Sequence, residues 1–307
     1  MKKFVLAFLP LLAAISGWSH AASAGGGRLG LSEAKQLAFQ PAATDIMRQI
    51  IEFHNFLLII TALIVILVFG LLFWVMFRYN AKANPVPTKT THNTILEIIW
   101  TAVPVMILVV IGIPSFRLLY YQQTIPEADL VIKATGHQWY WTHEYPELDQ
   151  LEIHSRMLPV SYFNPVMSEE TRLERRSALS ELQRMHSLDE PPEIYRLLDT
   201  DTRLVVPVNK IVKLLVTADD VLHSWAIPAF GIKIDAVPGR MNETWFRVEE
   251  IGTYYGQCSE LCGINHAFMP IVVEVVTQNE FDAWVIRAKE YYAAISPSGD
   301  VPIGVGR

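Results

Sequence analysis

The side chains best suited to chemistry lie close together toward the C-terminal end of the chain. Cys258, Cys262, His266 and Met269 fall within twelve residues, and the sequence of 307 residues contains 2 cysteines in all. Thiolate, imidazole and thioether donors in one short segment favour copper. A structural zinc site would use four Cys or His ligands and no Met. The segment therefore predicts a copper centre, with a disulfide between the two cysteines as the alternative for an exported protein.

The donor set suggests two metal ions rather than one. A single-copper electron-transfer site takes one Cys, two His and a weak axial Met, so this segment has a spare thiol and lacks one imidazole. His223, located 35 residues before Cys258, can supply that imidazole. Two thiolates that bridge two copper ions, each also bound by one His, would use all of these side chains. Met269 would complete one ion and the main-chain carbonyl of Glu260 the other.

Two long apolar runs in the first half of the chain predict membrane anchoring. Residues 56–77 contain no charged residue and, at about 1.5 Å per residue, would form a helix of roughly 33 Å, enough to cross a bilayer core. Residues 98–116 form the second run. The loop between the runs carries three cations, Arg78, Lys82 and Lys89. By the positive-inside rule this loop faces the cytoplasm. Core helices of a soluble domain are the alternative, which two such runs disfavour.

The remaining organisation follows from these two spans. Residues 1–24 have the layout of a cleaved signal peptide, and a first membrane helix is the alternative, disfavoured because the apolar run is short. We expect the following further segments: an exposed lead-in over residues 25–45, a transmembrane helical hairpin over 46–120, an outer domain over 121–293 and a tail over 294–307.

The sequence of the outer domain predicts a β structure. Five runs with strand character occupy residues 130–134, 138–145, 211–217, 244–248 and 271–276, with turn signals such as Pro238-Gly239 between several of them. Many short strands predict an antiparallel barrel or sandwich. Charged residues at helical spacing predict a helical or mobile insert at about residues 155–196. Thr277 and Glu280 form a capping box ahead of a C-terminal amphipathic helix.

The outer domain is also acidic. Residues 120–307 contain 27 Asp and Glu against 16 Lys and Arg, a formal net charge of −11, whereas the whole chain has −6. An acidic surface repels nucleic acid and attracts basic proteins. We therefore exclude nucleic acid as a partner. The alternative is that the acidity serves only solubility.

Three motifs, YYGQCSELCGINHAFMPIVVEVV, DVLHSWAIPAFGIKIDAVPGRMNETWF and ATGHQWYW, together resemble subunit II of haem–copper cytochrome c oxidases, over roughly residues 45–153 and 196–292. The resemblance implies a membrane-anchored protein with two transmembrane helices and an all-β, cupredoxin-like Greek-key barrel domain. It implies an electron-entry subunit of a proton-translocating oxidoreductase, cytochrome c oxidase. Such a subunit accepts electrons from cytochrome c at a dinuclear copper A centre and passes them to haem in subunit I, where oxygen is reduced to water with proton pumping. The implied partners are subunits I and III, cytochrome c and membrane lipid.

The resemblance also implies roles for individual residues. The implied copper ligands are His223, Cys258, Cys262, His266, Met269 and the carbonyl of Glu260. The Glu260 carboxylate would bind a Mg²⁺ ion shared with subunit I, since Mg²⁺ prefers oxygen ligands. Electrons would enter at Trp139, with Tyr140 beside it, and Glu97 would lie at the mouth of a proton channel. Four carboxylates would dock cytochrome c: Glu144, Asp201, Asp219 and Asp220.

These assignments have simpler alternatives in the sequence. Trp139 and Tyr140 could be ordinary strand aromatics, the four carboxylates could be solvated surface charges, and Glu97 could lie among lipid headgroups. The signal peptide and the insert point to a bacterial oxidase in the inner membrane, with the large domain on the periplasmic side. No CxxCH motif occurs, so we expect the electron donor to be a separate protein. A quinol oxidase subunit without copper and a copper-delivery protein are the competing functions.

Overall fold

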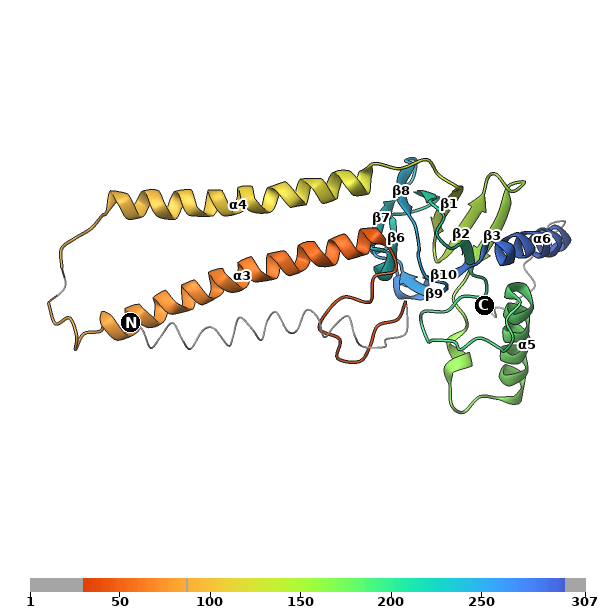
Figure 1. Cartoon of the computed structure of the whole chain (residues 1–307). Coiled ribbons are helices and arrows are strands. Elements are labelled where there is room, and N and C mark those ends of the chain that lie inside the picture. The colour runs from red at the N-terminus through yellow and green to blue at the C-terminus, as the bar shows by residue number, and fades with distance from the viewer. Residues whose placement is uncertain (1–29, 87, 296–307) are drawn as a thin grey trace. The chain divides into compact units, whose positions relative to one another are not determined.

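The computed structural model describes residues 30–86 and 88–295 (Figure 1). The chain divides into two compact units, one formed by Gln49–Gln123 and the other by Met1–Arg48 together with Thr124–Arg307. The predicted signal peptide and nearly all of the predicted tail lie outside the described residues.

Two long apolar helices confirm the predicted membrane spans. They are α3 (Asp45–Arg78) and α4 (Thr94–Gln123), whose most apolar windows have a mean hydropathy of 3.2 and 2.4 and no buried residue. Asn93 caps the N-terminus of α4, because its side-chain oxygen accepts hydrogen bonds from the backbone N–H groups of Ile95 and Leu96. Such a cap satisfies donors that the first turn of a helix leaves unpaired. Apolar side chains on all faces suit a helix surrounded by lipid.

The other unit contains, among its described residues, ten strands in three sheets. The largest sheet has the order β3 (Leu151–Ser155), β2 (Tyr140–Tyr145), β1 (Leu130–His137), β5 (Val212–Ala218) and β8 (Asn242–Phe246). The second has the order β4 (Leu204–Pro207), β10 (Pro270–Val276) and β9 (Gly252–Gln257), and β6 (His223–Ile227) pairs with β7 (Ile232–Ala236). The five predicted strands correspond to β1, β2, β5, β8 and β10, so the all-β prediction is confirmed.

The expectation of a wholly antiparallel arrangement is wrong in two places. The β1–β5 and β4–β10 pairs are parallel, whereas the other pairs are antiparallel. A parallel pair needs a crossover connection of a dozen residues or more. The chain between β1 and β5, which includes the insert, provides one. Alternating burial along β1 and β5 is the same for either pairing direction, so the sequence pattern could not distinguish them.

Large aromatic side chains fill the core between the sheets. Trp225 stacks on Phe246 with ring centroids 6.2 Å apart. The ring centroid of Phe230 lies 5.0 Å from that of Phe246 and 5.0 Å from that of Tyr254. All four of these side chains are 0% exposed. At about 25 cal/mol per Å² of buried apolar surface, each ring contributes roughly 4–6 kcal/mol before conformational entropy is counted. This core fixes the strand ends from which the functional loops emerge.

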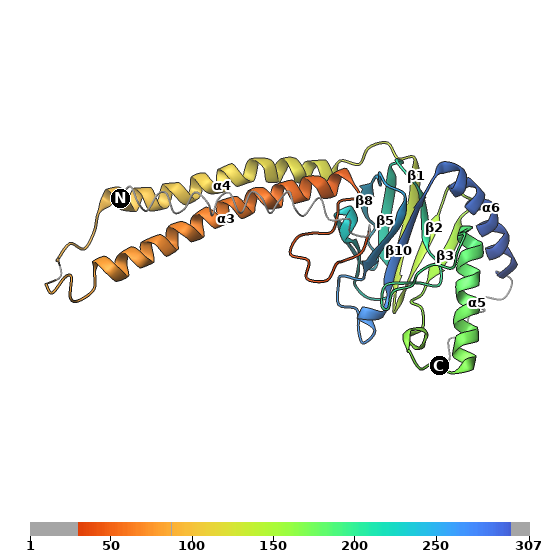
Figure 2. The same cartoon turned by 60° about the horizontal axis from the view of Figure 1, so that its bottom comes forward.

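The insert forms an ordered helix. A short turn, η1 (Val160–Phe163), precedes α5 (Glu169–His186), and α5 packs against the C-terminal helix α6 (Gln278–Ile295) (Figure 2). In the last turn of α5, His186 Nδ1 lies 2.7 Å from Glu274 Oε2, and both side chains are at most 8% exposed. The predicted capping box of α6 is confirmed, because the Thr277 N–H donates to Glu280 and the Glu280 N–H donates to the Thr277 hydroxyl.

The lead-in was predicted to be exposed, but its last residues are buried. Ala43 and Thr44 are each 1% exposed. The Ala43 N–H donates to the carbonyl of Ala229, and the Glu249 N–H donates to the carbonyl of Ala43. These residues add a short extended segment to the β unit, which the polar composition of the lead-in did not indicate.

Candidate metal centre

The donor residues come from two places that the strands bring together. Cys258, Glu260, Cys262, His266 and Met269 lie on the loop between β9 and β10, whose ends are held together where Pro270 pairs with Gln257. The other donor, His223, is the first residue of β6.

Two glycines allow the strands to approach one another at this point. A Cβ atom on Gly136 of β1 would lie 2.9 Å from ring atoms of His223. A Cβ atom on Gly256 of β9 would collide with the backbone of Ala226 in β6. Since these positions leave no space for a side chain, glycine is required for the loop and His223 to meet.

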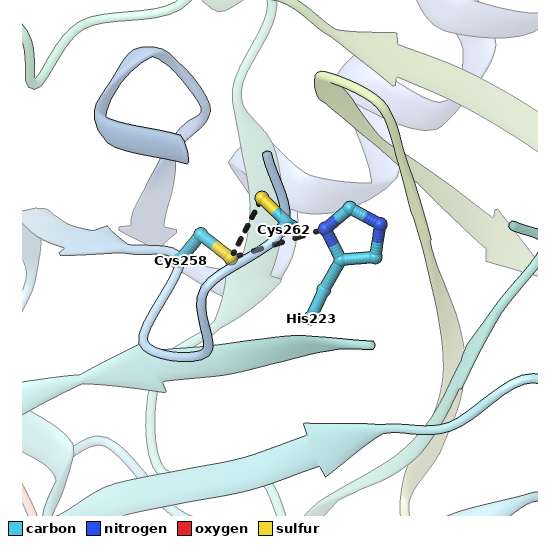
Figure 3. A group of neighbouring side chains, drawn as sticks. All are labelled: His223, Cys258 and Cys262. Atoms are coloured by element: carbon cyan, nitrogen blue, oxygen red, sulfur yellow. Dashed lines mark hydrogen bonds between the residues drawn. The ribbon is translucent and has the colours of Figure 1, made fainter. Parts of the chain in front are cut away.

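The five predicted ligand side chains and the Glu260 carbonyl form one cluster. The Sγ atom of Cys258 lies 3.9 Å from Cys262 Sγ, 3.9 Å from His223 Nδ1 and 3.3 Å from the Glu260 oxygen (Figure 3). The Sγ atom of Cys262 lies 3.5 Å from His266 Nδ1 and 3.5 Å from Met269 Sδ. Both cysteines are free thiols in this structure, so the disulfide alternative is not formed.

These separations fit donors that share a metal ion. Ligand atoms at about 2.0–2.3 Å from a tetrahedral ion are roughly 3.3–3.8 Å apart. Ligand atoms of His223, Cys258 and Cys262 all lie within 4.8 Å of one another, and the three residues are buried. Soft sulfur donors combined with imidazole match copper rather than magnesium or calcium.

The two thiols differ in acidity. Burial opposes ionisation of Cys258, but its hydrogen bonds with His223 and with the backbone of Glu260 and Ser224 lower its pKa to about 7. Burial and then the charge on Cys258 raise the pKa of Cys262 to about 12. Two thiolates this close oppose each other's ionisation, so a cation is needed to favour the loss of the second proton from the pair.

The predicted electron-entry residue, Trp139, contacts the loop between β9 and β10, which we call the metal-ligand loop. The indole Nε1–H of Trp139 donates to the carbonyl of Cys262 at 3.1 Å, and Gln138 Nε2 donates to the same oxygen at 2.8 Å. Gly263, with φ +117°, permits this contact, because a Cβ atom there would lie 3.1 Å from both side chains. Tyr140 points elsewhere and stacks on His137 with centroids 4.5 Å apart. Sequence reasoning gave no role to Gln138 or Gly263, although both lie within the motifs.

The four predicted docking carboxylates occupy different environments. Asp219 has a side chain that is 76% exposed, whereas Asp220 is 33% exposed and turned toward His223. Glu144 forms an ion pair with Lys133 at 2.6 Å. Asp201 accepts a hydrogen bond from the backbone of Arg156, and burial raises its pKa to about 7. Asp219 is therefore the member of this set best placed to meet a partner.

Several apolar side chains on the loop, and in the segment just before His223, are exposed, and we call them the apolar rim. Leu261 is 75% exposed and Ile264 is 86% exposed, which places two large aliphatic side chains beside His266. Val221, Leu222 and Phe268 are exposed as well. Contiguous exposed apolar residues mark sites of protein–protein contact.

Two carboxylates, those of Glu260 and Glu97, were predicted to have roles other than copper binding. The Glu260 side chain is half-buried. Glu97 lies in the first turn of α4, where its carboxylate accepts a hydrogen bond from the Asn93 N–H at 3.3 Å. The capping contact gives Glu97 a local structural task in addition to the role predicted from sequence.

Comparison with known proteins decides the family. The model described as the periplasmic domain of cytochrome c oxidase subunit II matches residues 130–187 and 180–276, and the model for its transmembrane domain matches residues 32–118. The chain belongs to the cytochrome c oxidase subunit II family.

Known relatives align with most of this chain. A probable cytochrome c oxidase subunit 2 of Rickettsia felis is 51% identical over 250 residues, covering 81% of this chain and 71% of the relative. Cytochrome c oxidase subunit 2 of Cereibacter sphaeroides is 46% identical over 251 residues, covering 82% and 80%. A crystal structure of the periplasmic domain of subunit II from Bradyrhizobium japonicum is 46% identical, with a TM-score of 0.43, and covers 55% of this chain and 99% of that one. As a subunit II, the chain is a membrane-anchored subunit of a terminal oxidase, and its family implies a copper centre.

Proposed function

We propose that this subunit receives single electrons from cytochrome c at a dinuclear copper A centre and delivers them to haem in subunit I, where oxygen is reduced and protons are pumped. One observation carries the proposal: two free thiols, two imidazoles, a thioether and a carbonyl meet at separations of 3.3–3.9 Å. This set exceeds what one blue-copper ion uses, since it has an additional thiol.

The donors fall into two groups around the thiol pair. Cys258 has His223 and the Glu260 carbonyl as neighbours, and Cys262 has His266 and Met269. With both thiolates shared, this arrangement would hold two copper ions, each with one imidazole and one weaker donor. Bound copper would supply a one-electron couple, and the thiolates of Cys258 and Cys262 would share its charge. The side chains of the protein keep the donors in place while the charge changes.

Trp139 would carry the electron into the site. Its indole is bonded to the carbonyl of Cys262, so the ring and a ligand residue are linked by one hydrogen bond. Asp219 and the apolar rim at Leu261 and Ile264 give a partner both charge and apolar contact. A lysine-rich cytochrome c fits this chemistry, because complementary charge accelerates encounter and apolar contact stabilises the complex. Tyr140 would accompany Trp139 at the point of electron entry, and Glu144, Asp201 and Asp220 would add to the acidic field.

The remaining roles concern the partner subunits and the compartment. The half-buried Glu260 carboxylate would bind Mg²⁺ together with ligands from subunit I, and Glu97 would lie at the mouth of a proton-uptake channel. Subunits I and III and membrane lipid would surround the two spans. The chain would be exported by its signal peptide and anchored in a bacterial inner membrane, with the copper domain in the periplasm.

Copper stoichiometry tests the proposal. The full-length chain, purified in detergent and reduced, is titrated with copper and examined by electron paramagnetic resonance. We expect two copper ions per chain and, in the one-electron-oxidised state, hyperfine coupling to two equivalent nuclei. The Cys262→Ser variant should lose this spectrum, because one bridging thiolate is gone. Binding of one ion per chain, or of none, by the wild-type chain would overturn the proposal.

A further inference from the structure

Asp220 lies in the turn between β5 and β6, and both of its carboxylate oxygens are engaged. Oδ1 lies 2.8 Å from His223 Nε2 and accepts the Val221 N–H at 2.6 Å. Oδ2 accepts the N–H of Gln138 at 2.7 Å. The preceding residue, Asp219, has the same charge but points outward, with a side chain 76% exposed. Two adjacent aspartates therefore have different surroundings, and only the second contacts a predicted metal ligand.

The contact with His223 determines which imidazole nitrogen is free. A neutral imidazole carries one N–H, and an ionised carboxylate can only accept. With a metal bound, His223 would be neutral, and the Asp220 carboxylate would hold its proton on Nε2 and leave the lone pair of Nδ1, which lies 3.9 Å from the Cys258 sulfur, for the metal. Metal-binding histidines commonly have their second nitrogen held by a carboxylate, and the loss of that partner weakens metal binding.

The contact with Gln138 extends the same carboxylate to the electron-entry turn. The Gln138 backbone N–H is held by Asp220, while the side chains of Gln138 and Trp139 both donate to the Cys262 carbonyl. The turn is thus linked to a histidine ligand through Asp220 and bonded directly to a cysteine ligand. His223 is 0% exposed, so solvent cannot replace Asp220 without rearrangement.

We propose that Asp220 is a positioning residue, which holds the His223 imidazole with Nδ1 toward the metal centre and fastens the Gln138–Trp139 turn beside it. This inference rests on the proposed copper centre and changes the role expected for Asp220 from its charge alone. A docking carboxylate acts through its long-range charge, and its removal weakens partner binding mainly at low salt, where screening is weak. A positioning carboxylate acts at short range, and its removal changes the metal centre itself.

The test compares Asp220→Ala with Asp219→Ala in the full-length chain. We expect Asp220→Ala to bind copper roughly 10–100-fold more weakly, with an altered visible spectrum and reduction potential at every salt concentration. Asp219→Ala should keep the copper affinity and spectrum of the wild type while losing cytochrome c affinity at low salt. Far-UV circular dichroism establishes that both variants are folded.

Asp220→Asn provides a second measurement if the alanine variant does not fold. The amide oxygen can still accept from His223 Nε2–H and from the Val221 N–H, whereas the amide NH₂ then faces the Gln138 N–H. We expect Asp220→Asn to keep its copper, to shift its spectrum and to slow electron entry through Trp139. A wild-type chain that binds no copper would refute the proposed function. Wild-type copper affinity, spectrum and potential in the folded Asp220→Ala variant, or in Asp220→Asn if only that variant folds, would refute the positioning role alone.

Discussion

Substitution of Gly136 by alanine should damage the metal centre more than it damages the fold. Gly136 lies in β1 against the imidazole of His223, and an added Cβ atom would lie 2.9 Å from two ring carbons. Carbon atoms in contact prefer at least about 3.5 Å, so the imidazole must move by about 0.6 Å. Metal ligands tolerate deviations of about 0.2 Å. The displacement is therefore about three times that tolerance.

The loss of stability should be smaller by comparison. Overpacking by one methyl group costs about 1–3 kcal/mol, and replacing glycine by alanine returns about 0.4–1 kcal/mol by restricting the unfolded chain. The net change is about 0–2.6 kcal/mol, which a folded domain survives. Copper affinity, in contrast, depends on the position of His223 itself.

The assay is a copper titration of the purified full-length variant, followed by its visible spectrum and thermal unfolding with and without copper. Gly70→Ala serves as the matched control, because a Cβ atom at that position meets nothing within 4 Å. We expect Gly136→Ala to unfold a few degrees earlier without copper and to show a much smaller stabilisation when copper is added. A variant with unchanged copper affinity and spectrum would show that His223 does not need its observed position.

Three further substitutions test the electron-entry residue, the anchored insert and a buried carboxyl group. Trp139→Phe removes the indole N–H that bonds to the ligand loop and should slow electron entry with little change in copper content; unchanged stopped-flow kinetics would exclude the route. His186→Ala removes the 2.7 Å partner of the buried Glu274 carboxylate, which keeps Arg203 at 3.6 Å, and should lower the stability of the fold by about 1–3 kcal/mol; thermal unfolding measures the loss. Burial raises the pKa of Asp201 to about 7 from 3.8, so the folded chain binds more protons than the unfolded chain between these values. Stability should therefore fall as the pH rises from about 4 to 7; the slope should be smaller in Asp201→Asn, and an equal slope would contradict the assignment.

The sequence predicted a set of soft donors that lie together in the structure, but it did not predict the groups that hold them. Cys258, Cys262, His266 and Met269 are recognisable because soft donors occur close together, and the structure brings His223 to them. Asp220 could not be distinguished from Asp219 by residue type, because a turn alone determines which of the two points inward.

Long-range pairing was the other part that the sequence pattern could not supply. The predicted strands were found at their expected places, but alternation of apolar residues carries no information about parallel or antiparallel partners. The insert was expected to be helical or mobile from its charges. Its attachment depends on the pairing of His186 with Glu274, two residues that have no periodic relation along the chain.

The metal-ligand loop owes its shape to groups outside it. The Ser259 N–H, next to Cys258, donates to the Ser224 carbonyl in β6, and Trp141 Nε1–H in β2 donates to the carbonyl of Met269. The carbonyl of Cys262 accepts two donors from the turn between β1 and β2. An electron-transfer site works fastest when its ligands move little between oxidation states, and donors fixed by a rigid surrounding shell meet that requirement. Under the proposed function, the strands around the loop would therefore affect the rate of electron transfer as directly as the ligands do.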